Sequence, residues 1–295
     1  MALRKSENLA AQITPDMKRD RDARNQKQLD FLSGIIKAAK LDVLVIFGDD
    51  QHEILLPDNM PGFMIFTGKE VPFRPTSAER LAAMSEGVRV ANWARVPEKD
   101  TMLRGAPELA ELIVRSAVAD GFDVSVSRYI ANKEQAETGV GHAFGFYYHR
   151  LLGDLADTPA LTTLPIFINT FFPPNQPPVR RVLAFGRSVG RAIRRWDRAA
   201  RVGIAASSGL SHFVIDEALD ERILNAIAKR DIPTILDEPE AHFQSGTSEI
   251  KNWIAAMGAL EDTGLVFELL DYVPCYRSLA GTGNAMAFGL WRAQK

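Results

Sequence analysis

Apolar positions along the chain follow two different periods, which predicts helices and buried strands in alternation. Thr14-Pro15 is typical of a helix N-terminus, and apolar residues recur at helical spacing up to Ile36, so we expect a long helix that ends near Lys40. Residues 41–48, LDVLVIFG, form a continuous apolar and β-branched run, as in a strand buried on both faces. A helix followed by such a strand predicts a parallel sheet.

The same alternation continues to the end of the chain. Residues 179–186, VRRVLAFG, are compatible with a strand or with a transition from a strand to the helix predicted over 186–200. Further helices and strands are predicted from their periodicity: helices over 107–120, 216–229 and 248–260, and strands over 122–130, 163–172, 201–207, 267–278 and 284–291. We therefore expect an α/β fold, with residues 1–295 in a single domain whose central, mostly parallel sheet is flanked by helices.

Composition and charge narrow the class of partner. Apolar residues make up 46% of the chain and charged residues 24%, as in an ordinary globular protein. The net charge of −2 gives no electrostatic support for a nucleic-acid or anionic-membrane partner. With Cys275 as the single cysteine, no intrachain disulfide can form, and neither a signal peptide nor a membrane-length apolar run is present. We expect a cytoplasmic protein that acts on a small molecule.

Two of the five histidines follow buried strands, where parallel sheets bind ligands. His52 comes just after the strand at 41–48, and His212 follows the strand at 201–207 in the same way. A metal or a substrate could bridge them at one rim of the sheet. Each is also compatible with an ordinary hydrogen-bonded or surface histidine. The acidic neighbours of His52, which are Asp49, Asp50 and Glu53, are compatible with orienting an imidazole or with solvated turn positions.

Other polar patterns are weaker. Glu249 follows Gly246-Thr247-Ser248 and, by pattern alone, indicates an acidic residue in the first turn of a helix, where it complements the helix dipole. A row of arginines at helical spacing favours a solvated helix face over an anion site; it comprises Arg187, Arg191, Arg194, Arg195 and Arg198.

Four segments taken together resemble a known family. They are VLVIFGDDQHE (43–53), GVGHAFGF (139–146), RVGIAASSGLSHF (201–213) and GTSEIKNWIAAMGAL (246–260). In order and context they look like the consecutive motifs of class III extradiol ring-cleavage dioxygenases, the group that contains the catalytic β subunit of protocatechuate 4,5-dioxygenase. The similarity extends from about Ala11 to the C-terminus.

This resemblance implies a role for each matching residue. His52 and Glu249 match metal ligands, His212 matches the catalytic histidine, and His142 resembles a residue that faces the substrate pocket. The implied cofactor is Fe(II), which binds a catechol and O2 for extradiol cleavage to a ring-opened semialdehyde-type acid. His212 would exchange protons. A homodimer or a complex with a small helical subunit is implied as the assembly.

One part of the family pattern is missing. Family members begin with a strand that delivers the first metal histidine, and here no histidine precedes His52. We expect an N-terminally shortened chain with weakened metal affinity and reduced stability. His142 or His149 could complete the metal site, although neither matches in position. The alternatives are a metal-deficient, non-catalytic homologue or subunit of the same fold, and a Zn-dependent hydrolase that uses the same ligands.

Overall fold

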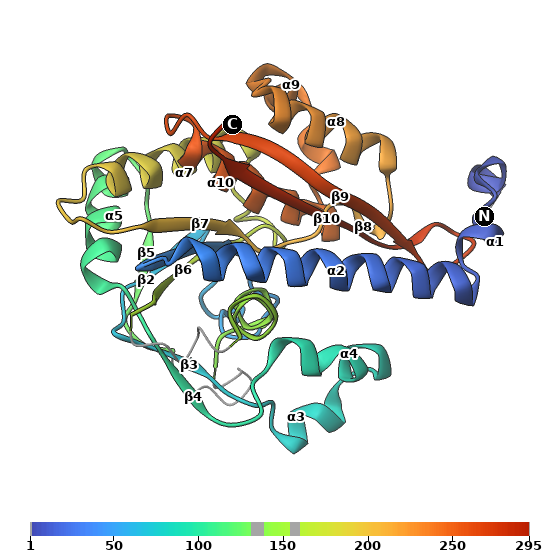
Figure 1. The fold of residues 1–295 in the computed structure, drawn as a ribbon, viewed down its shortest axis with the longest axis horizontal. Coiled ribbons are helices and arrows are strands. Elements are labelled where there is room, and N and C mark those ends of the chain that lie inside the picture. Colours follow the sequence, from blue (N-terminus) through green and yellow to red (C-terminus); the bar gives the residue numbers. More distant parts are fainter. Residues whose placement is uncertain (1, 131–138, 154–159, 295) are drawn as a thin grey trace.

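A five-stranded sheet forms the centre of the molecule in the computed structural model, which describes residues 2–130, 139–153 and 160–294. The strand order is β5-β2-β6-β1-β7, and of the four neighbouring pairs only β2 and β6 run antiparallel. The strands are β1 (Val43–Gly48), β2 (Phe63–Phe66), β5 (Ser125–Ser127), β6 (Thr162–Ile168) and β7 (Val202–Ala206). Helices flank this sheet (Figure 1), which confirms the predicted single-domain α/β fold with a mostly parallel sheet.

The predicted long helix and the strand after it form as their patterns indicate. Helix α2 covers Pro15–Ala39, and the hydroxyl of Thr14 accepts a hydrogen bond from the amide of Met17. Lys40 ends the helix in the left-handed region. Every residue of β1 is buried, because β1 lies between β6 and β7 with side chains packed on both faces.

Side chains of β1 alternate between two apolar layers. Val43, Val45 and Phe47 enter the larger core, whereas Leu44 and Ile46 enter a second core on the opposite face. Helices that contribute side chains to the larger core include α5 (Pro107–Ala119), α7 (Val179–Arg194), α8 (Glu217–Lys229) and α10 (Ile250–Leu260). The prediction of a strand or a strand-to-helix transition at residues 179–186 is wrong, because these residues are helical throughout and form the first half of α7.

Glycine permits the close contact between α7 and α10. A Cβ atom at Gly186 would lie 2.1 Å from the carbonyl oxygen of Ala255, so any side chain there would separate the two helices. This packing fixes α10, which begins directly after Glu249, against the sheet.

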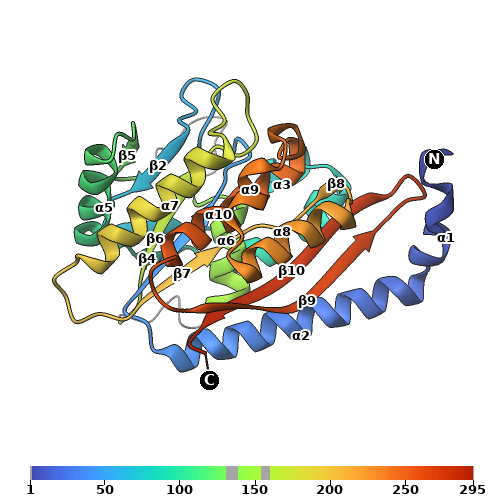
Figure 2. The same ribbon diagram turned by 90° about the horizontal axis from the view of Figure 1, so that it is seen from above.

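A second sheet of three antiparallel strands lies beside α2. It contains β8 (His212–Val214), β9 (Val266–Tyr276) and β10 (Thr282–Arg292) in the order β8-β10-β9. Figures 1 and 2 show α2 running along the β9–β10 hairpin, and the Arg24 guanidinium on α2 pairs with the Asp271 carboxylate on β9. The two closing strands were predicted from the sequence, and their pairing with β8 was not.

The remaining elements surround these two sheets. They include β3 (Glu70–Phe73), β4 (Thr101–Arg104), α1 (Leu9–Gln12), α3 (Ala78–Ala83), α4 (Glu86–Ala91), α6 (His142–Phe146), α8 (Glu217–Lys229) and α9 (Ile232–Asp237), with short 3-10 or π turns at 2–7, 92–95, 147–152, 240–242 and 245–249. Among the described residues, no helix has the length and apolar character needed to cross a bilayer.

Candidate metal centre

The carboxyl ends of β1 and β7 meet at one rim of the central sheet, because the two strands run parallel in register. Asp49 follows the end of β1, and Ser207 and Ser208 follow the end of β7. The chain then turns into β8, whose first residue is His212. Polar side chains are thus delivered to the position where open α/β sheets bind their ligands.

Three side chains at this rim converge closely enough to share a metal ion. Each of Asp49, His142 and Glu249 offers one donor atom, and these atoms lie within 4.8 Å of one another. Asp49 and Glu249 are buried, and Oδ1 of Asp49 has no hydrogen-bond partner among the residues that the structure describes. Burying an unpartnered carboxylate oxygen is costly, so it points to a ligand that is bound in the functional protein. Two carboxylates and an imidazole suit a divalent transition metal.

A buried glutamate holds His142 in place. Nδ1 of His142 lies 2.8 Å from Oε2 of Glu53, and the His142 amide donates to Oε1 of the same carboxylate at 2.8 Å. Because a carboxylate only accepts, Nδ1 carries the hydrogen and Nε2 is left for a metal. Arg95 forms an ion pair with the other side of Glu53. A Cβ atom at Gly141 would lie 2.3 Å from Oε2 of Glu53, so glycine is needed there.

Charges in this group change one another's pKa values. Burial lowers the pKa of His142, but the charge and hydrogen bond of Glu53 outweigh it and raise the value to about 10. Burial raises the pKa of Glu53, but His142 and Arg95 lower it to about 2. Burial and the nearby Glu249 raise the pKa of Asp49 to about 7. A bound cation would relieve the repulsion between these carboxylates.

His212 lies against the same group. Its Nδ1 atom is 2.9 Å from the carbonyl oxygen of Leu210, and its Nε2 atom is 3.2 Å from Oε1 of Glu249. Burial lowers the pKa of His212, but the hydrogen bond and charge of Glu249 raise it above its ordinary value. A Cβ atom at Gly246 would lie 2.4 Å from the imidazole, so glycine makes room for the ring.

Residues behind His212 fix the start of β8. Asp220 is fully buried and accepts hydrogen bonds from the amide of Ser211, the hydroxyl of Ser211 and the hydroxyl of Tyr272. The hydroxyl of Ser211 also accepts from the amide of Asp216. This network holds the backbone immediately before His212, which limits where its ring can lie.

His52 lies elsewhere on the rim. Its ring stacks on Phe172 with 3.6 Å between centroids, and its Nδ1 atom is 3.0 Å from the carbonyl oxygen of Leu55. His52 is not in the group formed by Asp49, His142 and Glu249. The structure therefore brings three of the four predicted site residues together, while the metal-ligand role of His52 stays a prediction. His149, the other proposed substitute, contacts Trp93 instead.

Asp49 and Glu53 are the site residues that sequence reasoning left undecided. Both were compatible with solvated turn positions, whereas the structure buries both side chains. One signal in the sequence could have identified Asp49. It directly follows a fully buried strand, so it lies at the carboxyl end of that strand, where parallel sheets bind ligands. The pairing of Glu53 with His142 joins residues 89 positions apart and had no local signal.

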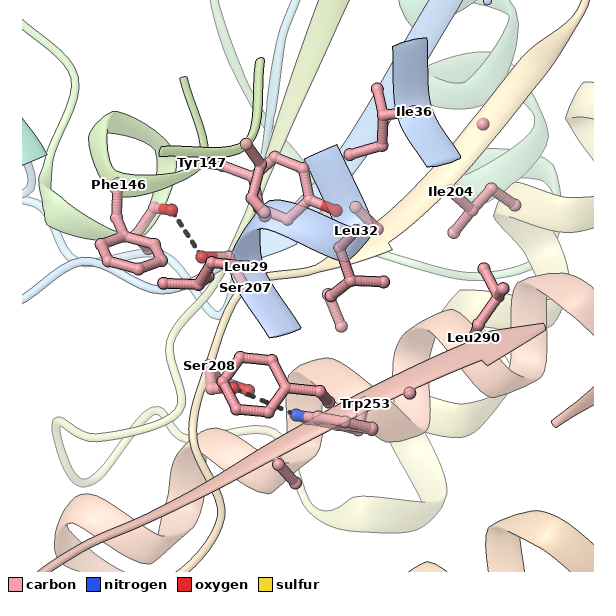
Figure 3. A pocket seen from close by; sticks show the side chains of 18 of the residues that line it. Leu29, Leu32, Ile36, Phe146, Tyr147, Ile204, Ser207, Ser208, Trp253 and Leu290 are labelled. Carbon is pink, nitrogen blue, oxygen red and sulfur yellow. Dashed lines mark hydrogen bonds between the residues drawn. The ribbon is translucent and has the colours of Figure 1, made fainter. Parts of the chain in front are cut away.

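A large cavity opens onto the group. It has a volume of about 870 Å³, and His142, His212 and Glu249 form part of its wall. Figure 3 shows Ser207 and Ser208 with Leu29 and Leu32 of α2 around this space. The Ser207 hydroxyl donates to the carbonyl oxygen of Ala143 and the indole of Trp253 to that of Ser208, which ties the cavity wall to the rim.

Comparison with known proteins identifies the family. Residues 9–283 match the family described as the catalytic LigB subunit of aromatic ring-opening dioxygenase. The chain belongs to this family. This confirms the resemblance seen in the sequence motifs.

Two curated relatives are similar to part of the chain. The chain is 28% identical over 177 residues to the 2,3-dihydroxyphenylpropionate/2,3-dihydroxicinnamic acid 1,2-dioxygenase of Azotobacter vinelandii, a match that covers 60% of this chain and 46% of the relative. It is 27% identical over 194 residues to the protein of the same name from Klebsiella pneumoniae, covering 63% and 51%. The chain thus spans about half the length of the curated relatives it matches.

Proposed function

We propose that this LigB-family chain catalyses the extradiol cleavage of a catecholic ring by O2. The observation that carries the proposal is the convergence of Asp49, His142 and Glu249, with His212 against Glu249, at the wall of a cavity. Family membership and the names of the relatives support the same reaction class.

Iron(II) fits this group and would be held by Asp49, Glu249 and Nε2 of His142. When bound, iron would pass electron density from the catechol to dioxygen, which lets dioxygen react with a closed-shell aromatic ring. His142 keeps its ring orientation through Glu53, so Nε2 would point at the same place before and after metal binding, which releases its proton. A bound cation would offset the charge repulsion from Glu249 that contributes to the raised pKa of Asp49.

His212 is the proposed acid and base. Carbonyl and carboxylate oxygens only accept, so Nδ1 donates to Leu210 and Nε2 donates to Glu249 when the ring is protonated, whereas the neutral ring keeps the hydrogen on Nδ1 and has its lone pair on Nε2. Nε2 faces Glu249 in the cavity wall, where a catechol hydroxyl would be bound. The ring can therefore take the proton from that hydroxyl and return it to the product, and its raised pKa strengthens its action as a base.

Anaerobic titration with Fe(II), followed by oxygen-consumption measurements across a panel of catechols, tests this function. The expected result is one equivalent of bound iron and ring-opened product. Glu249→Gln should lose iron, whereas His212→Gln should keep iron and lose turnover by about 100-fold or more. Tight iron binding without oxygen uptake would favour the non-catalytic homologue, and ester or amide hydrolysis with zinc would favour the hydrolase.

The same proposal includes a homodimer or a complex with a small helical subunit. An apolar surface on α4 and the turn after it supports such an interface, because Val88, Val90 and Trp93 are 51%, 68% and 56% exposed. Sedimentation analysis of the wild type and of a Val90→Lys variant tests it. A monomer in both would contradict the homodimer.

A further inference from the structure

We infer that the aromatic substrate carries an extended apolar substituent, which lies in the part of the cavity farthest from the metal group. This part, called the apolar channel below, is lined by Leu29, Leu32, Ile36, Ile204 and Leu290. The inference rests on the proposed function. It places the catechol ring at the metal group and the substituent of that ring in the apolar channel of the same cavity.

The size of the cavity is the first argument. A catechol is a single ring with two hydroxyl groups, and the cavity of about 870 Å³ lies in the upper range for sites that enclose drug-sized ligands. A bare catechol beside His142 and His212 would leave most of the space to water. Apolar walls that stay in contact with water in the complex contribute little to the binding free energy. A larger substrate would remove more of this surface from water and would therefore bind more tightly.

The shape of the cavity follows two strands. Along β10 the lining extends from Asn284, which is in register with His212, to Arg292. At roughly 3.4 Å per residue this is a length of about 27 Å. Along β7 it runs from Ser208 at the rim back to Val202 at the start of the strand. The cavity is therefore long, with the metal group at one end.

The polarity of the cavity wall differs between the end at the metal group and the opposite end. The side chains that offer polar atoms to the metal group lie at the rim, whereas α2, β7 and β10 supply aliphatic side chains farther along. Figure 3 shows Ile36, Ile204 and Leu290 pointing into the same space from these three elements. Leu32, Ile204 and Leu290 are only partly buried in the structure, so an apolar substituent would remove further surface from water.

Charges along the cavity disfavour an acidic substituent. Among the described residues of the cavity wall, the lysine and arginine side chains are those of Arg95 and Arg292. Arg95 forms an ion pair with Glu53, and Arg292 forms one with Glu268. A carboxylate placed in the apolar channel would lose its hydration without an uncommitted cation, which is costly. This separates the inferred substrates from the dihydroxyphenylpropionate named for the two relatives.

Calorimetric titration under anaerobic conditions tests the inference without relying on turnover. The ligands are catechol and 3-alkylcatechols from methyl to octyl, added to the Fe(II)-loaded protein. Each added methylene should tighten binding by up to about fourfold until the apolar channel is filled. 3-(2,3-Dihydroxyphenyl)propionate should bind at least about tenfold more weakly than the alkylcatechol of matched length.

Two variants test the apolar channel separately from the metal group. Leu32→Glu should abolish the gain from long alkyl chains while leaving catechol affinity within about twofold, because Leu32 lines only the apolar channel. Leu290→Trp should exclude octylcatechol by volume and keep an apolar wall. The matched control is Phe31→Glu, since Phe31 neighbours Leu32 on α2 but is 45% exposed and does not line the cavity.

The outcomes separate the two proposals. If catechol binds and is cleaved but chain length has no effect, the substrate-class inference is wrong and the proposed function stands. The same holds if the propionate binds best. If neither catechol nor any alkylcatechol binds or consumes oxygen, the proposed function fails and the inference fails with it.

Discussion

His142 and His52 both lie near the carboxyl end of β1, yet their surroundings prepare them for different tasks. His142 has a buried carboxylate behind Nδ1 and two further carboxylates in front of it. His52 has a carbonyl oxygen beside Nδ1 and an aromatic ring against its face. We therefore expect His142, rather than His52, to bind the metal, because buried carboxylates surround only the ring of His142 among these two histidines and orient its free nitrogen.

Removing His142 should have the largest effect. His142→Ala takes away the single imidazole of the metal group, so Fe(II) affinity should fall by more than the roughly 10- to 100-fold typical of losing a supporting partner. Anaerobic titration with a competing chelator measures the change. An unchanged affinity would mean that the metal binds elsewhere and would remove the distinction between the two histidines.

A smaller loss of Fe(II) affinity is expected when Glu53, which holds the ring of His142, is changed. Glu53→Gln keeps the size of the side chain but loses the charge that orients and polarises His142, so Fe(II) should bind about 10- to 100-fold more weakly. The same titration measures it. Asp50→Asn, which alters the neighbouring buried carboxylate, is the matched control and should have a weaker effect, because Asp50 bonds only backbone amides of residues 53–55.

The dependence of stability on pH in the metal-free protein is a smaller expected effect. Folding raises the pKa of His142 to about 10 from 6.5, so between these values the folded chain holds a proton that the unfolded chain has released. Its contribution to stability is complete below about pH 6.5 and is lost as the pH rises towards 10. Thermal unfolding in chelator should show a larger fall over this window for wild type than for His142→Gln. Parallel curves would contradict the coupling to Glu53.

The smallest effect on the metal is expected for His52→Ala. Its ring stacks on Phe172, so we expect a modest loss of thermal stability, on the order of 1 kcal/mol, with Fe(II) affinity within about twofold of wild type. The titration used for His142→Ala provides the direct comparison. A large loss of iron would support the ligand role that the sequence motif assigns to His52 and would overturn the ligand group proposed above.

Much of the fold could be predicted because its strands and helices have strong local periods. The α2 helix and β1 follow from a capped amphipathic segment and a continuous apolar run. The short strands β2 and β8 were not predicted. Their four and three residues are too few to show a periodic pattern of apolar positions, and their pairing depends on partners that are distant in the sequence. The antiparallel pairing of β2 with β6 likewise depends on residues that are far apart in the sequence.

The sequence by itself determined the α/β alternation, the placing of His212 after a buried strand and, through its motifs, the family. Only the tertiary structure decided which groups share a centre. Asp49, His142 and Glu249 are far apart along the chain and meet because β1 ends, and α6 and α10 begin, at one rim. The direction of a ring and the burial of a carboxylate depend on packing between distant segments, which no local pattern encodes. The Glu53 to His142 bond is the clearest instance, since it alone decides which nitrogen faces the metal group.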